Sequence, residues 1–522
     1  MAKIVTAAEM AALDRRAIED CGIPSLELME RAGAGIAVVL GRRFLNLSHR
    51  RIHVVCGRGN NGGDGLVVAR CLRRQAGACP VVWVVAAPAE LSADARENLA
   101  RLPEDVECHT AADAREFAAV AAGLSPWDLI VDALLGTGAS GPPRPPYTQW
   151  IEAINQSPAA RVAVDLPSGM DGDRAQPGRL CVRADLTVTL GLPKRGLVCH
   201  GNLDAVGGLE IVPLGFPPEL TREDDAHPVL FGEEHARRLL PRRPPTTAKW
   251  DAGRLLVLAG SETMQGAGAM VANAAVLAGA GLVQLVSHGR GSLHPALRPE
   301  VLTGGEWRGT RYDAVVIGPG LGGEAALLLR ALAEESAGPV VVDADALVPF
   351  VQDLNRWRGR PAVLTPHVGE LARMIGVPRI EDADDRMELA AKWAREWRVT
   401  LLVKGPRTLV ADSEGRLSVN ASGNAWIASG GMGDALAGIL GALLAQGMTP
   451  WSAARLAAYL SGAAADRCIV GGARPLAASE VAAAVPEVWQ DLAAARTRPP
   501  LTATGAQAAR DFDQVNSTGG RD

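Results

Sequence analysis

The sequence predicts an α/β protein with two consecutive domains, and three observations lead to this fold class. Short apolar runs alternate with segments of helical apolar spacing, which is typical of mainly parallel sheets covered by helices on both faces. The 522 residues are enough for two or three domains. A charged and proline-rich stretch interrupts the alternation between residues 213 and 245. We therefore expect a first domain over 1–220, a second over 228–495, and a disordered tail over 496–522.

The amino-acid composition indicates a globular protein and argues against several other classes. Hydrophobic residues make up 48% of the chain and charged residues 21%, which indicates a globular protein, and the net charge of -5 gives no electrostatic reason to expect a nucleic-acid partner. The eight cysteines are scattered without a Cys-x-x-Cys pair, so neither a disulfide framework nor a zinc site is expected. The N-terminus lacks the apolar core of a signal peptide. We expect a cytoplasmic protein.

One uncharged stretch, residues 266–286, is long enough to raise the question of a membrane span. It is rich in Gly and Ala and contains Asn273 and Gln284. These features fit a buried helix followed by a strand better than a span. No membrane partner is expected.

In the first domain, two helical patterns open the chain at about 7–21 and 25–44. Five strand candidates follow, at 52–56, 81–86, 129–131, 162–165 and 186–190. In the second domain the strand candidates include 254–258, 314–317, 340–343, 362–364 and 401–403, and long helical patterns continue to about 494. Ligands of such sheets collect beyond the carboxyl ends of the strands, so polar clusters that follow strands are candidate sites.

The first such cluster is the glycine-rich and asparagine-rich segment 57–65, which joins a predicted strand to a helical pattern at 66–72. Glycines in this position allow positive φ and bring backbone N–H groups close to an anion. The asparagines and the aspartate add side-chain oxygens. An ordinary Asn-Gly turn is the alternative, but five glycines are more than a turn requires. The segment is predicted to be a ligand site.

Two further polar clusters, 132–142 and 165–171, follow later strands of the same domain. Helix capping is the simple explanation for a carboxylate at a strand end. Three clusters in one sheet make capping alone a poor explanation. Together they supply amide, carboxylate and hydroxyl oxygens, which are the ligands of a hard cation, and glycine N–H groups for a phosphate-bearing ligand.

These segments resemble the NAD(P)H-hydrate epimerase family from about residue 7 to 216, and the Asn-Asn-Gly-Gly-Asp run is the most specific element. The resemblance implies a Rossmann-like three-layer αβα domain and a potassium ion held by Asn61, Asp132 and Ser168. It also implies that the hydrated nicotinamide dinucleotide contacts Asn60, Asn61, Gly62, Gly63, Asp64, Gly136, Thr137, Gly138, Ala139, Ser140, Gly141, Pro142 and Asp165.

Asp165 is the candidate acid and base for interconverting the two hydrate epimers. A purely structural hydrogen-bonding role at the strand end is an equal alternative. Lys194 is a second candidate, ranked lower because exposed lysines near turns are usually just solvated.

In the second domain the strongest signal is the segment 420–424 followed by the glycine-rich segment 428–438. A glycine run that leads into an apolar helix directs free N–H groups and the positive helix end toward a phosphate. Asp434, at the start of this helix, is a candidate general base beside a transferring phosphoryl group. An N-terminal cap is the alternative role for this aspartate.

This arrangement resembles the ribokinase-like superfamily and, more closely, the ADP-dependent NAD(P)H-hydrate dehydratase family over about 228–494. Supporting matches lie at 266–268, 318–322, 365–370 and 404–408. The resemblance implies that the hydrated dinucleotide contacts Ala267, Gly320, His367 and Asp434, although a satisfied hydrogen-bonding role is the alternative for His367. It further implies that the adenine nucleotide binds at Lys404, Gly405, Pro406, Arg407, Thr408 and Gly433.

The resulting hypothesis is a bifunctional repair enzyme for hydrated NADH and NADPH. The first domain would equilibrate the R and S hydrates, and the second would use ADP, with Mg2+ on its phosphates, to dehydrate the S form. The alternative is a small-molecule kinase for a sugar or vitamin precursor, fused to a non-catalytic dinucleotide-binding module. Small-molecule substrates are the expected partners, and a homo-oligomer is expected because both families commonly assemble.

Overall fold

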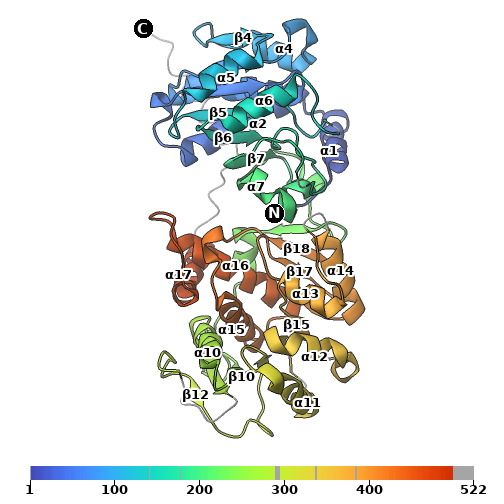
Figure 1. Ribbon diagram of the computed structural model, residues 1–522, viewed down its shortest axis with the longest axis vertical. Helices are drawn as coiled ribbons and strands as arrows, with labels where there is room; N and C mark the ends of the chain where they lie inside the picture. Colours follow the sequence, from blue (N-terminus) through green and yellow to red (C-terminus); the bar gives the residue numbers. More distant parts are fainter. Residues whose placement is uncertain are drawn as a thin grey trace. The chain divides into compact units, whose positions relative to one another are not determined.

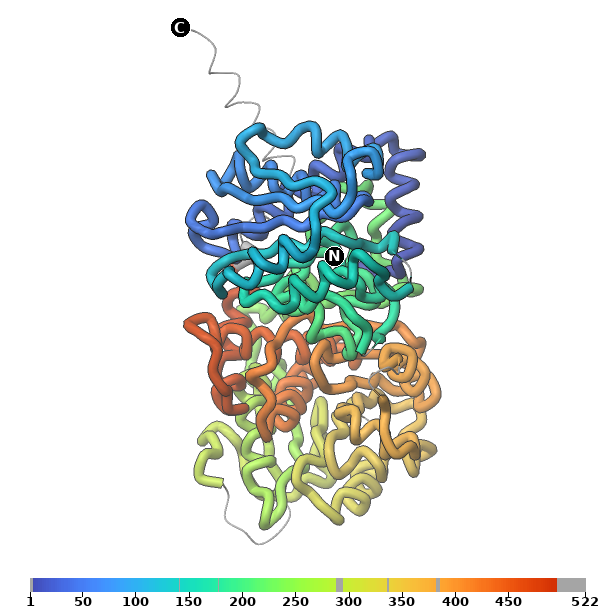
Figure 2. The backbone as a smooth tube through the Cα atoms, turned by 45° about the horizontal axis from the view of Figure 1, so that its top comes forward, coloured from blue at the N-terminus to red at the C-terminus, as the bar shows by residue number. Residues whose placement is uncertain are grey.

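The computed structural model describes residues 2–139, 141–176, 178–287, 294–335, 338–381 and 385–497. The chain divides into two compact units, which Figure 1 and Figure 2 show in colours that follow the sequence. One unit comprises residues 2–224, and the other comprises residues 225–381 and 386–497. Each unit contains its own sheet and its own hydrophobic core.

The first unit is built on a parallel sheet with the strand order β4-β3-β2-β5-β6-β7-β8. The chain runs outward from β2 through β3 to β4 and then returns to place β5 on the other side of β2. Ligands bind at such a switch point, beyond the carboxyl ends of the two central strands. The strands are β2 (Ile52–Cys56), β3 (Val81–Val84), β4 (Cys108–Thr110), β5 (Leu129–Ala133), β6 (Ala160–Val164), β7 (Leu186–Leu190) and β8 (Gly208–Val212).

Helices cover both faces of this sheet, because successive strand residues point to opposite sides. Val54 packs into the core that α1 to α4 cover, whereas Val55 packs against Phe117 of α5 and Trp150 of α6. The unit is therefore a three-layer αβα structure, preceded by the short strand β1 (Ala2–Lys3). Its helices are α1 (Ala7–Glu19), α2 (Ser25–Arg43), α3 (Asn60–Ala76), α4 (Ala93–Ala100), α5 (Ala114–Ala122), α6 (Tyr147–Gln156), α7 (Leu203–Val206) and α8 (Pro218–Thr221).

The predicted loop at 57–65 is shorter than expected, because α3 already begins at Asn60. The physical reason given for its glycines was also wrong, since none of the five has a positive φ. Close packing requires four of them instead, since only at Gly59 would a Cβ meet nothing within 4 Å. A Cβ on Gly57 would lie 1.9 Å from the Leu134 carbonyl oxygen, and a Cβ on Gly62 would lie 1.9 Å from the Gly57 carbonyl oxygen. The first turns of α3 therefore lie directly against the ends of β2 and β5.

The sheet of the second unit runs in the order β9-β18-β17-β16-β15-β14-β13-β10-β11-β12. Its strands pair in parallel except at β16-β17-β18, which are antiparallel. A switch point again lies between central strands, here β10 and β13. The strands are β9 (Val229–Phe231), β10 (Arg254–Leu258), β11 (Leu282–Val286), β12 (Leu302–Thr303), β13 (Ala314–Ile317), β14 (Val340–Val342), β15 (Ala362–Leu364), β16 (Thr400–Val403), β17 (Leu409–Ala411) and β18 (Leu417–Asn420).

Helices α10, α15, α16 and α17 pack on one face of this sheet in a single core, and α11 to α14 cover the other face (Figure 1). The helices are α9 (Glu233–Leu239), α10 (Gln265–Leu277), α11 (Ala325–Glu335), α12 (Leu347–Gln352), α13 (Val368–Ile375), α14 (Arg386–Trp397), α15 (Met432–Ala445), α16 (Pro450–Cys468) and α17 (Ala478–Thr497). Because α17 reaches Thr497, the first two residues of the predicted tail are helical, and 498–522 lie outside the described residues.

The uncharged stretch 266–286 forms most of α10 and the whole of β11, which confirms the predicted helix followed by a strand. Across the described ranges, no helix combines the length and the hydropathy that a membrane span needs.

Candidate active sites

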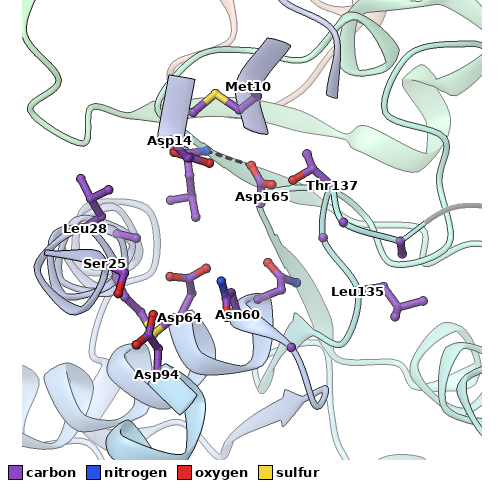
Figure 3. Close-up of a pocket in the computed structure, with 18 of the residues that line it drawn as sticks. Met10, Asp14, Ser25, Leu28, Asn60, Asp64, Asp94, Leu135, Thr137 and Asp165 are labelled. Carbon is purple, nitrogen blue, oxygen red and sulfur yellow. Dashed lines mark hydrogen bonds between the residues drawn. The ribbon is translucent and has the colours of Figure 1, made fainter. Parts of the chain in front are cut away.

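A cavity of about 510 Å³ lies at the carboxyl ends of β2, β5 and β6 in the first unit (Figure 3). Gly62 and Gly63 are buried in α3, and Gly141 and Pro142 lie further along an exposed loop. Ser140 lies outside the described residues. The predicted residues that line the cavity are Asn60, Asn61, Asp64, Gly136, Thr137, Gly138, Ala139 and Asp165.

Asp165 follows β6 directly and has a φ of 66°, which is unusual for a residue other than glycine. Its Oδ1 atom accepts hydrogen bonds from the Thr189 hydroxyl at 3.2 Å, the Leu190 N–H at 3.2 Å and the Lys194 ammonium. The expectation that Lys194 is a solvated lysine was wrong, because it is 1% exposed. Asp165 and Lys194 form a buried ion pair at the wall of the cavity.

Three more carboxyl groups, those of Asp14, Asp64 and Asp94, line the same cavity (Figure 3). Burial raises the pKa of Asp14 to about 6, an effect that Lys194 opposes and Asp165 reinforces. Burial also raises the pKa of Asp64 well above its ordinary value. Asp14 escaped the sequence analysis, although Met10, Asp14 and Ile18 share one face of α1 at a spacing of four residues. An aspartate between two apolar residues on one helix face is the sequence feature that could have identified Asp14.

Asp132 and Ser168 are buried and hydrogen-bonded to each other. The Ser168 hydroxyl donates to Asp132 Oδ1 at 2.6 Å, and the Ser168 N–H donates to Oδ2 at 2.8 Å. Burial raises the pKa of Asp132 to about 6, and these hydrogen bonds oppose the shift. The Leu135 N–H donates to the Ser168 hydroxyl at 2.8 Å, and the next residue, Gly136, lies beside Asn61, whose Oδ1 would be 3.1 Å from a Cβ at that glycine. The three predicted cation ligands thus surround one short loop.

In the second unit, the predicted residues gather at the carboxyl ends of neighbouring strands. Lys404, after β16, donates to Asp343 Oδ1 at 2.6 Å, and its Nζ lies 3.7 Å from Glu370 Oε2. A Cβ on Gly433 would lie 3.2 Å from the Lys404 ammonium. Lys404 also forms an isolated parallel bridge with His367. Asp343 and Glu370 were not among the predicted site residues.

Asp434 lies in the first turn of α15. The N-cap residue of this helix is Gly431, with a φ of 84°, so Asp434 does not have the alternative capping role. Burial raises the pKa of Asp434 to about 6, the charge of Asp343 adds to the shift, and Lys404 opposes it. The helix start, the carboxyl group and the ammonium therefore belong to one site.

Ala267 and Gly320, which the resemblance assigned to the hydrated dinucleotide, lie side by side at the switch point of the second sheet. Gly320 has a φ of 67°, and a Cβ there would lie 3.0 Å from that of Ala267. Nearby, Gly318 approaches Asp343 so closely that a Cβ would be 1.8 Å from the Asp343 carbonyl oxygen. Gly318, two residues before Gly320, therefore lies beside Asp343, whose side chain accepts the hydrogen bond from Lys404.

His367 is the N-cap residue of α13. Its Nδ1 atom accepts from the N–H groups of Gly369 at 3.0 Å and Glu370 at 3.3 Å, and Glu370 Oε2 accepts from the His367 N–H at 2.7 Å. The satisfied hydrogen-bonding role that was the alternative for His367 is therefore observed, because its Nδ1 atom caps the helix. The side chain is 55% exposed.

The predicted nucleotide segment 404–408 runs beside the end of β18. Arg407 has a φ of 54° and donates to the Ala421 carbonyl oxygen at 2.8 Å. The Asn420 N–H donates to the Thr408 carbonyl oxygen at 2.8 Å, whereas Gly405 and Pro406 are exposed. The two predicted motifs, 404–408 and 420–424, thus lie side by side.

Comparison with known proteins matches each unit separately. Residues 25–196 match the family described as YjeF-related protein N-terminus, and residues 255–486 match the family described as NAD(P)H-hydrate dehydratase. The ADP/ATP-dependent NAD(P)H-hydrate dehydratase from Bacillus subtilis, co-crystallised with ATP/Mg2+, is 31% identical, with a TM-score of 0.46, over 51% of this chain and 98% of that one.

Curated relatives match both units together. The bifunctional NAD(P)H-hydrate repair enzyme of Moorella thermoacetica is 38% identical over 516 residues, 94% of this chain and 97% of its own length. That of Escherichia coli is 36% identical over 474 residues, 87% of each chain. The expected order of two α/β units is confirmed, and the second of them matches the dehydratase family. The chain belongs to the family of bifunctional NAD(P)H-hydrate repair enzymes.

Proposed function

We propose that this protein restores hydrated NADH and NADPH through two reactions, one in each unit. The first unit interconverts the R and S hydrates. The second uses ADP to remove water from the S hydrate and releases AMP and phosphate. The observation that carries this proposal is the similarity to curated repair enzymes, which runs through both units at 38% identity over 516 residues.

In the first unit, Asp165 acts as the base. All three hydrogen bonds described for its carboxylate reach Oδ1, so Oδ2 is left to face a substrate. The positive φ of Asp165 supports a functional reading, because backbone strain of this kind concentrates at active sites. The dinucleotide would occupy the cavity between α1, α3 and the loop 134–139.

A potassium ion in this unit would be held by Asn61, Asp132 and Ser168. The site fits a monovalent cation, because it offers one buried carboxylate together with amide and hydroxyl oxygens. Among the described residues, no three His, Cys, Asp or Glu side chains are grouped to hold a more highly charged metal. The ion would supply a positive charge beside a carboxylate that burial destabilises.

A binding measurement tests the ion independently of activity. Potassium should raise the unfolding midpoint of the wild type, because a ligand that binds only the folded state stabilises it. The same salt should have less effect on Asp132→Asn. An equal rise in both proteins would exclude Asp132 as a ligand.

In the second unit, Asp434 would deprotonate the ring hydroxyl, whose oxygen then attacks the β-phosphorus of ADP as the bond to AMP breaks. The phosphate then leaves the ring carbon with the electron pair of the C–O bond, water takes a proton from the neighbouring ring carbon, and the ring double bond is restored. Ala267, Gly320 and His367 would face the hydrated ring, and 404–408 with Gly433 would face the nucleotide. Backbone N–H groups at the start of α15 are suited to the phosphate, and Mg2+ would accompany ADP.

The test is recovery of reduced-nicotinamide absorbance from a mixture of R and S hydrates of NADH with ADP and Mg2+. The proposal predicts recovery from both epimers. Phosphorylation of a sugar or vitamin-precursor alcohol by ATP, without any recovery of absorbance, would instead favour the kinase alternative. Omission of ADP should stop recovery and leave epimerisation running.

A further inference from the structure

We propose that Asp14 is a second proton-transfer residue in the cavity of the first unit and that it works with Asp165 on neighbouring atoms of the substrate ring. This inference rests on the proposed epimerase function. Asp14 comes from α1, outside every motif that pointed to the site. Figure 3 shows Asp14 and Asp165 at the wall of the same cavity.

The hydrogen bonds of Lys194 leave the Asp14 carboxyl group available. An ammonium group has three N–H donors. Lys194 donates to Asp165 Oδ1, to the Thr189 hydroxyl at 3.1 Å and to the Leu190 carbonyl oxygen at 2.7 Å. Asp14 is close enough to feel the charge of Lys194. Within the described part of the chain, however, no hydrogen bond reaches its carboxyl oxygens, so these remain for a ligand.

Asp14 and Asp165 therefore differ in their surroundings although they share one ammonium. Asp165 is fixed by an ion pair and two further hydrogen bonds, whereas burial raises the pKa of Asp14 to about 6. The charged or titratable groups that act on Asp14 are Lys194, Asp165 and, from α3, Asp64, and Arg58 and Asp94 also line the cavity. Carboxyl groups in such unequal environments divide into an acid and a base, as in other enzymes that move protons near neutral pH.

The chemistry of the hydrate needs such a pair. Water adds to an enamine at the carbon bonded to nitrogen, so the hydroxyl oxygen and the ring nitrogen share one carbon. Asp165 Oδ2 takes the hydroxyl proton, the C=O bond forms, and the C–N bond breaks. The electron pair of that bond goes to the nitrogen, which takes the proton of Asp14. The free aldehyde rotates, and the reverse steps close the ring on its other face, with no oxidant or co-reactant consumed.

The experiment follows purified R hydrate toward its epimer equilibrium by chromatography, without ADP, so that the second unit is silent. Full-length Asp14→Asn should be slower than the wild type by about 10²–10⁴-fold, the usual contribution of one acid or base. Asp14→Glu keeps an acid and should be at least about tenfold faster than Asp14→Asn. Glu19→Gln, an exposed change on the same helix, should stay within about twofold, since surface changes are usually mild.

The order of the two Asp14 variants separates proton transfer from a structural role. Asparagine has the size of aspartate and keeps one acceptor oxygen, whereas glutamate adds a methylene group. A structural role therefore predicts that Asn is tolerated better than Glu, and this order would overturn the proposal. Wild-type rates for Asp14→Asn would overturn it as well.

A pH profile gives a second measurement, and its wild-type part does not depend on any variant folding. In the wild type, kcat for epimerisation should fall at alkaline pH as Asp14 loses its proton. The pH profile of Asp14→Asn should lack this alkaline decline. A flat alkaline side in the wild type would contradict the proposal. Dehydration of S hydrate with ADP should be unchanged in all variants. If the wild type itself does not accelerate epimerisation, the proposed function fails and not merely the role of Asp14.

Discussion

One carboxyl group is the proposed base in each unit, so its replacement tests which unit performs which reaction. Asp434→Asn keeps the side-chain size at the start of α15 but removes the proposed base. Dehydration of the S hydrate should therefore fall by about 10²–10⁴-fold. Epimerisation of the R hydrate, measured on the same preparation without ADP, should continue at the wild-type rate. A parallel loss of both activities would contradict the assignment of one reaction to each unit.

The surroundings of Asp434 make a prediction about pH. Its pKa is raised to about 6, chiefly by burial, and the base must be ionised, so kcat for dehydration should be lost as the pH falls through about 6. The Asp343 charge contributes to the shift, and Lys404, its ion-pair partner, opposes it. In Asp343→Asn the acid limb should therefore move to lower pH. Profiles measured at saturating ADP and S hydrate test this, and an unmoved limb would mean that Asp343 does not act on Asp434.

Sequence reasoning found the residues whose position follows from the sheet. Asn61 and Asp165 follow parallel strands, and the ends of such strands share one edge, so their meeting at one cavity was predictable. Asp14 was not found, because only the packing of α1 brings it to the cavity. Asp343 was placed at a strand end but was not linked to Lys404, since that ion pair depends on strand order rather than on local pattern.

Helices and strands likewise divide into those that the local sequence pattern predicts and those that depend on their neighbours in the fold. Long apolar runs such as β2 and β10 were predicted with their observed bounds. The strands β4, β8, β9, β12, β17 and β18 were not predicted. Several of them are two or three residues long, too short to show a period, and β17 is fixed by its antiparallel pairing with β16 and β18.

The start of α3 allows a test of close packing. In Gly62→Ala the new Cβ would lie 1.9 Å from the Gly57 carbonyl oxygen, a backbone atom of the segment that joins β2 to α3, so that either this segment or the helix must shift. We expect a loss of about 1–3 kcal/mol in the free energy of unfolding and a matching loss of epimerisation. Gly41→Ala is the matched control, because nothing lies within 4 Å of its Cβ on α2. It should be neutral or stabilising by up to about 1 kcal/mol. Denaturant unfolding of both variants gives the comparison, and equal effects would contradict the packing argument.

At the scale of the whole molecule, the two reactions use separate machinery. Each unit has its own sheet, its own core and its own switch point, and the residues proposed for each reaction come from one unit. A change in one site therefore leaves the other site's fold intact. The connection between the reactions is chemical, because the S hydrate is the product of one and the substrate of the other.

This independence predicts complementation between two defective chains. Asp165→Asn alone should rapidly recover only the S fraction of a mixed hydrate preparation, and Asp434→Asn alone should recover none. Mixed together with ADP, they should recover both epimers, because the S hydrate released by one chain reaches the second unit of the other through solution. Absorbance of the reduced nicotinamide measures the extent and the rate. A mixture that stops at the S fraction, while the wild type completes the reaction, would mean that both sites must work within one chain.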